Sequence, residues 1–316
     1  MPPAISIVIP TFKREDVLQI LLDTVLDQSV LPGKYEVVVV DNASSPHMPT
    51  QELCQSSRYS LLNIRCLHNP VLGVSQARNF GMRSSSAPYV AFLDDDEKIP
   101  MHWVERALEI IENYSPDFFG GPYHPIYLEA KPAWFKEKYM SRTLGINKGW
   151  LENGELLFGL NLVVQRKWFD QLKGFSTDFG RRGNNHEQGE DVELQLRARS
   201  LGARFYYDPE LYVFHQVFPK QLKPGWFTTH AWYQGKSHAK LFSRDERKGK
   251  STFGYALNKL KTTIVQAFYL VGLYLYMPFR KKEGAVFQEN YLVESVAPEI
   301  HDLSNSWYSF LLCFKK

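Results

Sequence analysis

The first hundred residues alternate between short apolar runs and amphipathic segments, and this alternation constrains the fold more than any other feature. Residues 37–40 are four consecutive valines, which is typical of a strand buried on both faces. Three similar runs, and two segments with apolar residues at helical spacing, complete the pattern: 5–9, 63–67 and 89–93; 15–28 and 74–84. Short strands that alternate with helices predict an α/β fold with a Rossmann-like, mostly parallel sheet flanked by helices.

The rest of the chain is less regular. Residues 120–150 are rich in Gly, Pro and aromatic residues and favour irregular structure, and the polar, Gly-rich residues 179–189 favour a loop. Further strands are predicted at 157–165, 204–207 and 211–215, and helices at 101–112 and 190–201. Pro224 and Gly225 indicate a boundary. We therefore expect one domain over 1–225, with halves 1–100 and 101–225, and a mainly helical extension over 226–316.

Composition excludes several classes of protein. Thirty-seven Lys and Arg against thirty-four Asp and Glu give a net charge of +3, which is too small to indicate nucleic-acid binding. Three widely spaced cysteines form neither a disulfide framework nor a zinc pattern, so a reducing cytoplasm is the expected location. The N-terminal residues lack the charged and long apolar regions of a secretory signal.

The residues that follow each predicted strand carry the candidate chemistry, because ligands bind at the carboxyl ends of strands in an open parallel sheet. These positions hold cations, a single acid, small turn residues and a run of four acids. In chain order they are Pro10, Thr11, Phe12, Lys13 and Arg14; Asp41 and Asn42; His68, Asn69 and Gly73; Asp94, Asp95, Asp96 and Glu97.

The run of acids suggests a metal site. Adjacent carboxylates repel one another in a partly dry site, and a divalent cation removes that cost. Oxygen ligands suit Mg²⁺ or Mn²⁺, which proteins usually bind through one or two carboxylates together with substrate phosphates. The alternative is that these aspartates cap the helix predicted at 101–112. Neither GxGxxG nor GxxxxGK[ST] follows the first strand, so a nucleotide must be held in another way.

Four stretches in order resemble one known family: ISIVIPTFKRED, VVVVDNAS, NPVLGVSQARNFGMRSSSAPYVAFLDDDEKIP and GEDVELQLRARSLGARFYYDPELYVFHQV. They resemble the opening strand and loop, the second strand with its base-pairing acid, the approach to the DxD metal motif, and the acceptor-side ED motif with its downstream histidine. The family is glycosyltransferase family 2, with the GT-A fold. The resemblance covers about two thirds of the chain, roughly residues 5–217.

The resemblance implies a role for each matching residue. Asp41 would accept a hydrogen bond from the imide N–H of uracil or thymine. The other residues of the nucleotide-sugar site would be Pro10, Thr11, Phe12, Arg14, Asn69, Gly73, Arg78, Asp94 and Asp95, with Arg78 near the diphosphate. Asp96 would ligate the metal, and His215 would complete its shell or contact the diphosphate. Asp191 would be the general base, and Glu190 would orient the acceptor.

These roles imply an inverting, metal-dependent glycosyltransferase of cell-surface polysaccharide synthesis. The donor would be a UDP-sugar, with a dTDP-sugar second, and the acceptor a saccharide or a lipid-linked saccharide. Two alternatives stay open: a sugar-nucleotide nucleotidyltransferase, for which a Gly-rich phosphate loop is missing, and a silent GT-A-like binding protein. Taken singly, Asp41 also fits an Asx turn, and Glu190 and Asp191 fit helix caps.

The C-terminal part contains a mostly apolar segment at 262–279, with Lys259 and Lys261 before it and three basic residues at 280–282. Its length is at the short end for a membrane span. An interfacial helix at the inner face of the cell membrane, through residues 259–282, fits the basic flanks. The alternatives are a helix buried against the catalytic domain, a contact in a homo-oligomer and, third, a true span.

Overall fold

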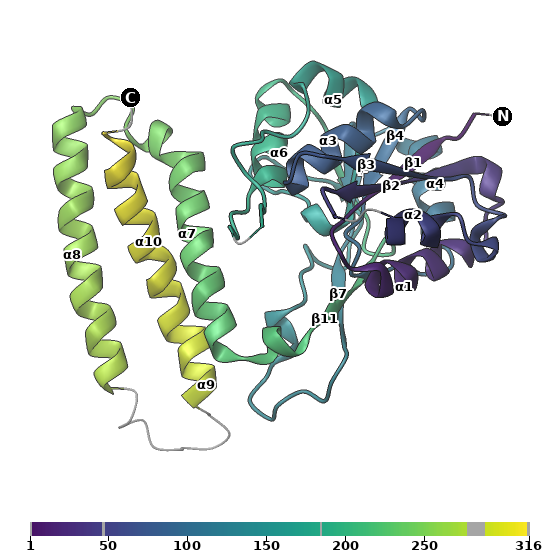
Figure 1. Cartoon of the computed structure of the whole chain (residues 1–316). Helices are drawn as coiled ribbons and strands as arrows, with labels where there is room; N and C mark the ends of the chain where they lie inside the picture. Colours follow the sequence, from purple (N-terminus) through teal and green to yellow (C-terminus); the bar gives the residue numbers. More distant parts are fainter. Residues whose placement is uncertain (1, 46–47, 184, 277–287, 315–316) are drawn as a thin grey trace. The chain divides into compact units, whose positions relative to one another are not determined.

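The structure, a computed structural model, describes residues 2–45, 48–183, 185–276 and 288–314 (Figure 1). The central sheet has eight strands in the order β3-β2-β1-β4-β9-β6-β10-β8. Their bounds are β1 Ile5–Thr11, β2 Tyr35–Asn42, β3 Ile64–Asn69, β4 Tyr89–Phe92, β6 Phe118–Gly120, β8 Gly149–Trp150, β9 Leu162–Gln165 and β10 Phe205–Tyr207. Strands β1 to β4 are parallel, whereas β9 and β8 run antiparallel to their neighbours. The predicted α/β architecture with a mostly parallel sheet is confirmed.

Helices cover both faces of this sheet, as the continuous apolar runs of the strands require. Ile7 and Val39 face one buried cluster, and Val8 and Val38 face a second cluster on the opposite side. The first cluster includes buried residues of α1 (Glu15–Leu26) and α4 (Trp103–Tyr114) and also Cys54, the last residue of a shorter helix. The second includes residues of three others: α3 (Val74–Ser84), α5 (Arg166–Leu172) and α6 (Glu190–Ser200). A short helix, α2, spans Met48–Cys54.

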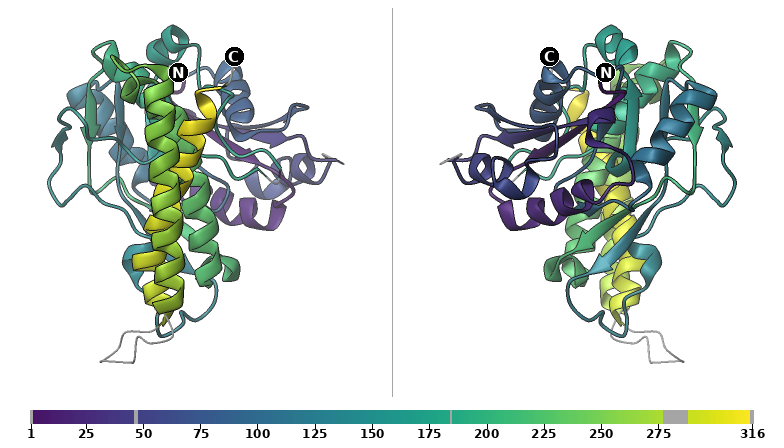
Figure 2. Two further views of the ribbon diagram at one scale, coloured as in Figure 1. Left: turned by 90° about the vertical axis from the view of Figure 1, so that its left-hand side faces the viewer. Right: turned by 90° about the vertical axis from the view of Figure 1, so that its right-hand side faces the viewer.

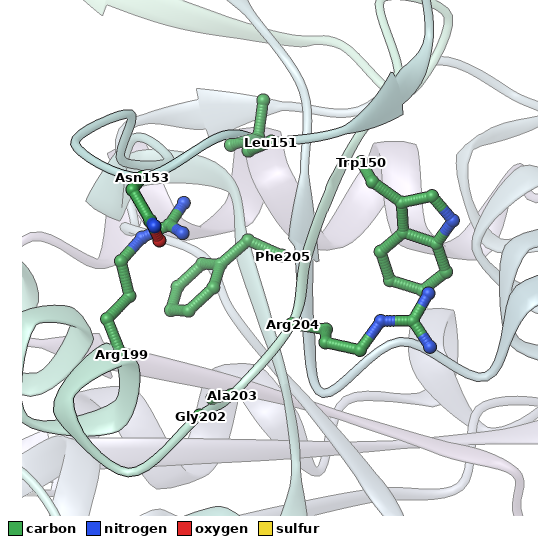
Figure 3. A pocket seen from close by; sticks show the side chains of 8 residues that line it. All are labelled: Trp150, Leu151, Asn153, Arg199, Gly202, Ala203, Arg204 and Phe205. Atoms are coloured by element: carbon green, nitrogen blue, oxygen red, sulfur yellow. The ribbon is translucent and has the colours of Figure 1, made fainter.

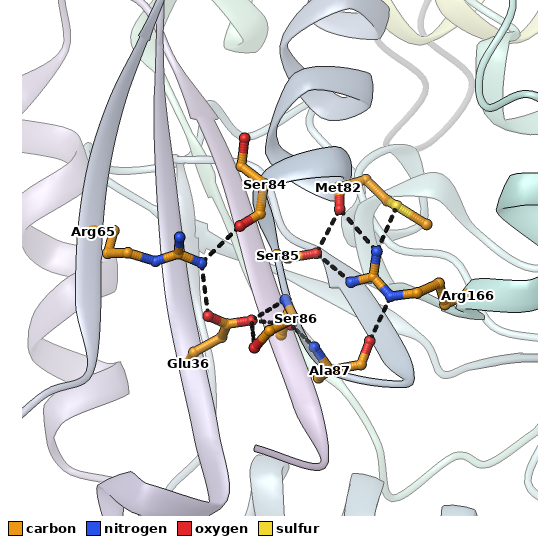
Figure 4. A network of polar contacts seen from close by, with 9 residues as sticks. Glu36, Arg65, Met82, Ser84, Ser85, Ser86, Ala87 and Arg166 are labelled. Carbon is orange, nitrogen blue, oxygen red and sulfur yellow. Dashed lines mark hydrogen bonds and ion pairs between the residues drawn. The ribbon is translucent and has the colours of Figure 1, made fainter. Parts of the chain in front are cut away.

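A polar network ties together the N-terminal ends of the parallel strands (Figure 4). The Glu36 carboxylate accepts hydrogen bonds from the side chain of Ser6, from both the backbone and the hydroxyl of Ser86, and from Arg65. Arg166 donates to the carbonyls of Ala87 and Met82 and to the Ser85 hydroxyl. The network lies at the start of the strands, so the opposite edge is left for the residues that follow the strand ends.

A second, three-stranded sheet has the order β5-β11-β7, with bounds Glu97–Lys98, Val213–Val217 and Tyr123–Tyr127. The prediction that residues 120–150 are irregular is wrong in part, because they contain β7 and β8. Both are edge strands, and an edge tolerates Pro125 because no neighbour needs its missing N–H. The strand predicted over 157–165 begins only at Leu162, after a single helical turn at Gly159–Asn161.

The chain folds as two compact units. The first comprises residues 1–126, 140–178 and 190–216, and the second comprises 127–139, 179–189 and 217–316. The division predicted from sequence, 1–225 and 226–316, stays a prediction. Within the second unit, α7 (Pro224–Glu246), α8 (Thr252–Tyr276) and α10 (Ala297–Leu312) lie alongside one another (Figure 2), and α9 (Gln288–Tyr291) precedes α10.

Close packing between α7 and α10 depends on small residues. A Cβ atom on Gly235 would collide with the backbone of His301, so only glycine allows this approach. The Ser304 hydroxyl donates a hydrogen bond of 2.6 Å to the carbonyl of Trp232. The predicted helical C-terminal region is confirmed, although α8 begins ten residues before the predicted segment. Residues 277–282 of the predicted interfacial helix, 259–282, lie outside the described residues. Over the described ranges, the chain has no helix both long and apolar enough to span a bilayer.

Candidate active site

The register of the parallel strands brings three strand ends into one row. Thr11 on β1 is paired with Asp41 on β2, and Asp41 is paired with His68 on β3. The loop after β4, which carries Asp94 to Asp96, follows the same edge of the sheet because β4 is parallel to β1. The strand-end residues collected from the sequence therefore share one edge, which is where an open parallel sheet binds ligands.

Arg14 and the carboxylates after β4 form the centre of this edge. The Arg14 guanidinium donates to Asp95 at 2.9 Å and to Asp96 at 3.0 Å, and the Thr11 hydroxyl donates to Asp95 at 2.7 Å. Burial raises the pKa of Asp95 to about 7, with Asp96 adding to the shift and Arg14 opposing it. Negative charge is therefore concentrated in a site with little water, and a cationic ligand would lower its energy.

Asp96, in the turn between β4 and β5, and His215, on β11, are the two predicted metal ligands, and they lie close together. His215 Nε2 lies 3.7 Å from Asp96 Oδ1, and β11 holds this geometry because His215 is paired with Glu97 across the small sheet. The backbone N–H of Gln216 also donates to the Asp96 carbonyl at 2.8 Å. A carboxylate oxygen and an imidazole nitrogen suit Mn²⁺ or Mg²⁺ when phosphate or water fills the other coordination positions of the ion. No group of three or more His, Cys, Asp or Glu side chains that could hold a metal ion occurs among the described residues.

Glu97 is a member of the cluster that sequence reasoning did not place in the site. Its side chain is fully buried, and neither carboxylate oxygen has a hydrogen-bond partner within the part of the chain that the structure describes. Burial, reinforced by Asp94 and Asp96, raises its pKa well above the ordinary value. Its position directly after three aspartates was the available signal, but burial of the fourth acid follows only from the β5–β11 pairing.

Asp41 lies at the end of β2 with its carboxylate 1% exposed. One oxygen accepts a hydrogen bond of 3.2 Å from the backbone N–H of Ser44, and the other lies 2.9 Å from His68 Nδ1. The contact with Ser44 reaches three residues along the chain, whereas the Asx turn that the sequence allowed would reach two. Sequence reasoning noted His68 after the third strand but gave it no role.

Asn69 and Gly73 organise the connection between β3 and α3. The Asn69 side chain donates to the carbonyl of Val71 at 2.8 Å, and the Gly73 N–H donates to the side chain of Asn42 at 3.0 Å. Gly73 has a φ of 140°, a conformation that favours glycine, and it directly precedes the first residue of α3. These contacts fix the loop beside Asp41.

Arg78 joins two carboxylates that are far apart in the sequence. Its guanidinium donates to Asp94 at 2.7 Å and to Glu190 at 2.8 Å, and its side chain is 4% exposed. The neighbouring Asn79 exchanges two hydrogen bonds of 2.8 Å with the backbone of Phe175, which keeps α3 in register with the chain before α6. Arg78 therefore connects the predicted donor side of the site with the predicted acceptor side.

Asp191 lies in the first turn of α6, beside Glu190. Burial raises the pKa of both carboxyls above their ordinary values, while Arg78 opposes the shift. A Cβ atom on Gly159 would collide with the Asp191 carboxylate, so the glycine makes room for it. Gln195, one turn later, binds the backbone of Leu157 through both ends of its amide and holds α6 against this segment. Gly159 carried no signal in the sequence.

All the predicted site residues belong to the first compact unit. Pro10 is buried in β1, and Phe12 is 37% exposed in the loop that follows. The contacts form three sets: one around Asp95 and Asp96, one around Asp41, and one in which Arg78 connects Asp94 to Glu190. The functional roles of these residues stay predictions, since the geometry shows where the residues lie and how they pair.

A cavity of about 250 Å³ lies elsewhere in the first unit, against β8 and β10 (Figure 3). Arg204 stacks over the ring of Trp150 at 3.7 Å, and Arg199 lies over the ring of Phe205 at 4.2 Å. None of the predicted site residues lines it. Trp150 is therefore part of an edge-strand stack with Arg204.

Three comparisons with known proteins bear on the family and the fold of this chain. The sequence profile described as Glycosyl transferase family 2 matches residues 6–173, more than half of the chain. A glucosyl-dolichyl phosphate glucuronosyltransferase of Haloferax volcanii is 26% identical over 245 residues, covering 74% of this chain and 75% of that protein. The succinoglycan biosynthesis protein ExoM of Rhizobium meliloti is 23% identical over 262 residues, covering 82% and 81%.

A solved structure shows the same fold. It is the mannosyltransferase PcManGT from Pyrobaculum calidifontis in complex with GDP-Man and Mn²⁺, with a TM-score of 0.56 and 18% sequence identity. The similarity covers 79% of this chain and 66% of that one. The predicted GT-A fold is thereby confirmed. With more than half of its length matched by the family profile, this chain belongs to glycosyl transferase family 2 and is a glycosyltransferase.

Proposed function

We propose that the protein transfers a sugar from a nucleotide-sugar to a hydroxyl of a saccharide or lipid-linked saccharide, with inversion at the anomeric carbon. The observation that carries the proposal is the convergence, at one sheet edge, of the buried Asp41, the Arg14–Asp95–Asp96 cluster and the Arg78 link to Glu190. This reaction requires a hydrogen-bond acceptor for the nucleotide base, a site for the diphosphate and its metal ion, and a pair of acids, all next to one another.

Asp41 is the residue proposed to recognise the base. Its carboxylate accepts hydrogen bonds only, and the imide N–H of uracil or thymine is a matching donor. Ser44 and His68 hold the two oxygens in place, so the acceptor is preorganised. This chemistry favours UDP as the donor nucleotide, with dTDP second.

The diphosphate is proposed to lie beside Arg14 and Asp96. Asp96 and His215 are the residues that would hold Mn²⁺ or Mg²⁺, and their oxygen and nitrogen atoms lie close enough to share one ion. When bound, such an ion stabilises the negative charge that develops on the leaving diphosphate. PcManGT was solved with Mn²⁺ and a nucleotide-sugar, which supports divalent metal use in this fold.

Asp191 is proposed as the general base. It takes the proton of the acceptor hydroxyl as that oxygen forms its bond to the anomeric carbon and the bond from this carbon to the diphosphate oxygen breaks. One base and one displacement invert the configuration. Burial raises the pKa of Asp191, which brings the carboxylate closer in basicity to the hydroxyl proton it removes. Glu190, held by Arg78, is proposed to orient the acceptor.

The acceptor class is supported by the relatives. The Haloferax protein is described as acting on a glucosyl-dolichyl phosphate, and the Rhizobium protein as acting in succinoglycan biosynthesis. Both descriptions concern the growth of a glycan chain. We therefore place this protein in the synthesis of a polysaccharide or glycolipid in the cytoplasm, at the inner face of the cell membrane.

The first test is thermal stabilisation by UDP, dTDP, GDP and CDP, each with and without Mn²⁺. A ligand at 100 times its Kd stabilises the folded state by about 2.7 kcal/mol, so one plate ranks the nucleotides. We expect a Mn²⁺-dependent shift that is largest with UDP, and its loss in Asp41→Asn. If GDP or CDP gives the largest thermal stabilisation, the proposed role of Asp41 is contradicted. Asp27→Asn, which changes a helix C-cap outside the site, is the matched control.

The outer surface of α8 supports contact with a membrane. Five apolar residues on one stripe of the helix expose between 42% and 75% of their surface, and we call them the apolar α8 face: Leu257, Ile264, Phe268, Val271 and Leu275. Lys261 is exposed at the same helical spacing, and α8 contains no Asp or Glu. An apolar stripe with a cation fits an anionic phospholipid surface. In a symmetric contact between two copies of the chain, by contrast, the positively charged lysines of the two copies would face and repel each other.

Flotation with vesicles tests this surface. We expect the protein to float with phosphatidylglycerol vesicles more strongly than with phosphatidylcholine vesicles, and Phe268→Ser with Leu275→Ser to abolish flotation. Leu31→Ser, which removes an exposed leucine from the first unit, is the control. Membrane contact would be contradicted if the wild type does not float with vesicles and light scattering shows a dimer that these α8 substitutions dissociate.

A further inference from the structure

The cavity beside β8 and β10 lies at the end of the sheet opposite the candidate active site. β9 is antiparallel to β4, β6 is antiparallel to β9, and β10 is parallel to β6, so β10 runs in the same direction as β4. Arg204, which lines the cavity, comes directly before β10, whereas Asp94 comes after β4. The cavity therefore lies at the start of these strands, and all of its lining residues belong to the first compact unit.

The lining of this cavity is cationic. Eight residues form it, and they include Arg199 and Arg204 but no Asp or Glu. Figure 3 shows the two arginine side chains on either side of the ring of Phe205. Two cations without an acid give a small concave site a positive potential, which favours an anionic ligand.

Arg204 is held by an aromatic ring and not by a carboxylate. Its guanidinium lies 3.7 Å over the ring of Trp150, which is 40% exposed. The nearby Asp117 accepts a hydrogen bond from the Arg204 backbone N–H at 2.9 Å, but its carboxylate is ion-paired with Lys167. Stacking occupies a face of the guanidinium and leaves the N–H groups at its edge, which form the fork that binds a carboxylate or a phosphate.

Arg199 contributes a second charge that the chain compensates only in part. It lies 4.2 Å over the ring of Phe205 and donates to the backbone carbonyl of Glu155. The Glu155 carboxylate itself accepts the backbone N–H of Glu152 at 2.9 Å. Burial lowers the pKa of Arg199, and the charge of Glu155 opposes this shift without cancelling it. An anion in the cavity would supply the missing compensation.

The size of the cavity and its uncharged residues narrow the class of ligand. Its volume of about 250 Å³ is below the roughly 300–1,000 Å³ of sites for drug-sized ligands, so it suits a group of about one sugar ring. The Asn153 amide both donates and accepts hydrogen bonds, as a sugar hydroxyl requires. Leu151 and Trp150 offer apolar surface to the C–H groups of such a ring. A neutral sugar would leave both arginines without a counter-charge, whereas a sugar with a carboxylate supplies one.

We infer that this cavity is a second saccharide site, which binds an acidic sugar unit with its carboxylate on the guanidinium of Arg204 and within the field of Arg199. The chain is a glycosyltransferase, so saccharides are the ligands that it encounters. Because the cavity and the candidate active site lie at opposite ends of the strands, the second site binds a glycan without occupying the place of the donor. It needs neither the proposed metal ion nor the proposed base.

Calorimetric titration of the full-length chain with trigalacturonate tests this site. Maltotriose is the neutral saccharide of the same length, and inorganic phosphate is the bare anion. EDTA is present throughout, so that a metal ion cannot bridge the carboxylates to the candidate active site. We expect trigalacturonate to bind at least tenfold more tightly than either of the other two ligands.

Variants locate the binding. Arg199→Gln with Arg204→Gln should raise the Kd for trigalacturonate at least tenfold, because both charged partners of the carboxylate are lost. Arg58→Gln with Arg83→Gln is the matched control, since it removes the same charge from two exposed arginines elsewhere in the first unit, and it should leave the Kd unchanged. If the first double variant folds poorly, Arg204→Gln alone replaces it, because this side chain is exposed.

Two more variants separate a built site from general attraction and from the candidate active site. Trp150→Leu keeps every charge but removes the ring that holds Arg204, and it should raise the Kd at least threefold. Asp191→Asn should leave the Kd unchanged. This last result is independent of whether Asp191→Asn abolishes transfer, so the second site and the proposed base can fail separately.

Four results would overturn the inference. The first is no binding of trigalacturonate by the wild type, and the second is phosphate or maltotriose binding as tightly as trigalacturonate. The third is an equal loss of binding in both double arginine variants, which would indicate attraction by net charge alone. The fourth is a Kd that Asp191→Asn raises as much as the loss of Arg199 and Arg204 does, which would place the saccharide in the candidate active site.

Discussion

Replacement of Arg78 by glutamine is the most informative single perturbation of the site. The side chain of Arg78 is 4% exposed and forms ion pairs with Asp94, 30% exposed, and Glu190, 12% exposed. Glutamine keeps a polar side chain but removes the charge, so both carboxylates lose their cationic partner. The burial that already raises the pKa of Glu190 would then act without opposition from Arg78.

The expected cost follows from this geometry. Removing one partner of a buried ion pair destabilises a protein by roughly 3–5 kcal/mol, because the remaining charge is left without compensation. Asp94 retains some contact with water, so we expect the lower end, about 3 kcal/mol. A change of that size lowers the Tm of a unit of 150–250 residues by roughly 6–12 °C, at about 2–4 °C per kcal/mol.

Urea unfolding followed by tryptophan fluorescence measures the cost, with Arg58→Gln as the matched control. Arg58 pairs with Asp23 at 2.6 Å, but its side chain is 56% exposed, and such solvent-screened surface pairs contribute little to stability. Glu190→Gln leaves Arg78 paired with Asp94 and should cost less than Arg78→Gln. If Arg78→Gln is no more destabilising than Arg58→Gln, the ion pairs that join the two sides of the site do not carry the energy assigned to them.

Three other predictions test the base, its surroundings and the remote network. Asp191→Asn should lower kcat by roughly 10²–10⁴-fold. The kcat of the wild type should fall with decreasing pH through a pKa above the ordinary aspartate value of about 3.9, because burial raises the pKa of Asp191. A fall in kcat at or below that pH would contradict Asp191 as the base. Gly159→Ala should lower kcat by roughly 100-fold, because its Cβ displaces the Asp191 carboxylate, while Gly33→Ala, in open space, should have no effect on the same assay. For Glu36, burial acts to raise the pKa, but the hydrogen bonds from Ser6, Ser86 and Arg65 outweigh it and lower the pKa. Its contribution to stability, about 2 kcal/mol relative to Glu36→Gln, should therefore be complete above about pH 4.3 and should disappear as the pH falls through the lower pKa of Glu36 in the folded state. Chemical unfolding of both proteins between pH 7 and pH 3 measures this contribution, and a difference in the free energy of unfolding that stays constant with pH would contradict the reasoning.

Much of the first unit was predictable because its signals are local. The alternation of β1 and β2 side chains between the two buried clusters depends only on the period of a strand. The amphipathic period of α3 predicted its bounds, Val74–Ser84, without error. The strand-end positions of Asp41 and Asp95 followed from the same pattern. Where the prediction was wrong, at β7 and β8, the strands are short edge strands of two to five residues. Their formation depends on a neighbouring strand and not on their own composition.

By itself, the sequence determined the mostly parallel α/β architecture, the family and the residue types available at the sheet edge, because periodicity and motif order are properties of contiguous residues. The tertiary structure alone decided which of those residues meet. Arg78 and Glu190 are 112 positions apart, and no local pattern indicates that they share an ion pair. The same holds for Arg204, which stacks on Trp150 of an edge strand that the sequence pattern did not predict, and for Gly159, whose importance depends on the carboxylate that occupies the space beside it. Contacts between distant segments depend on how the helices and strands pack, and packing is a property of the folded chain as a whole.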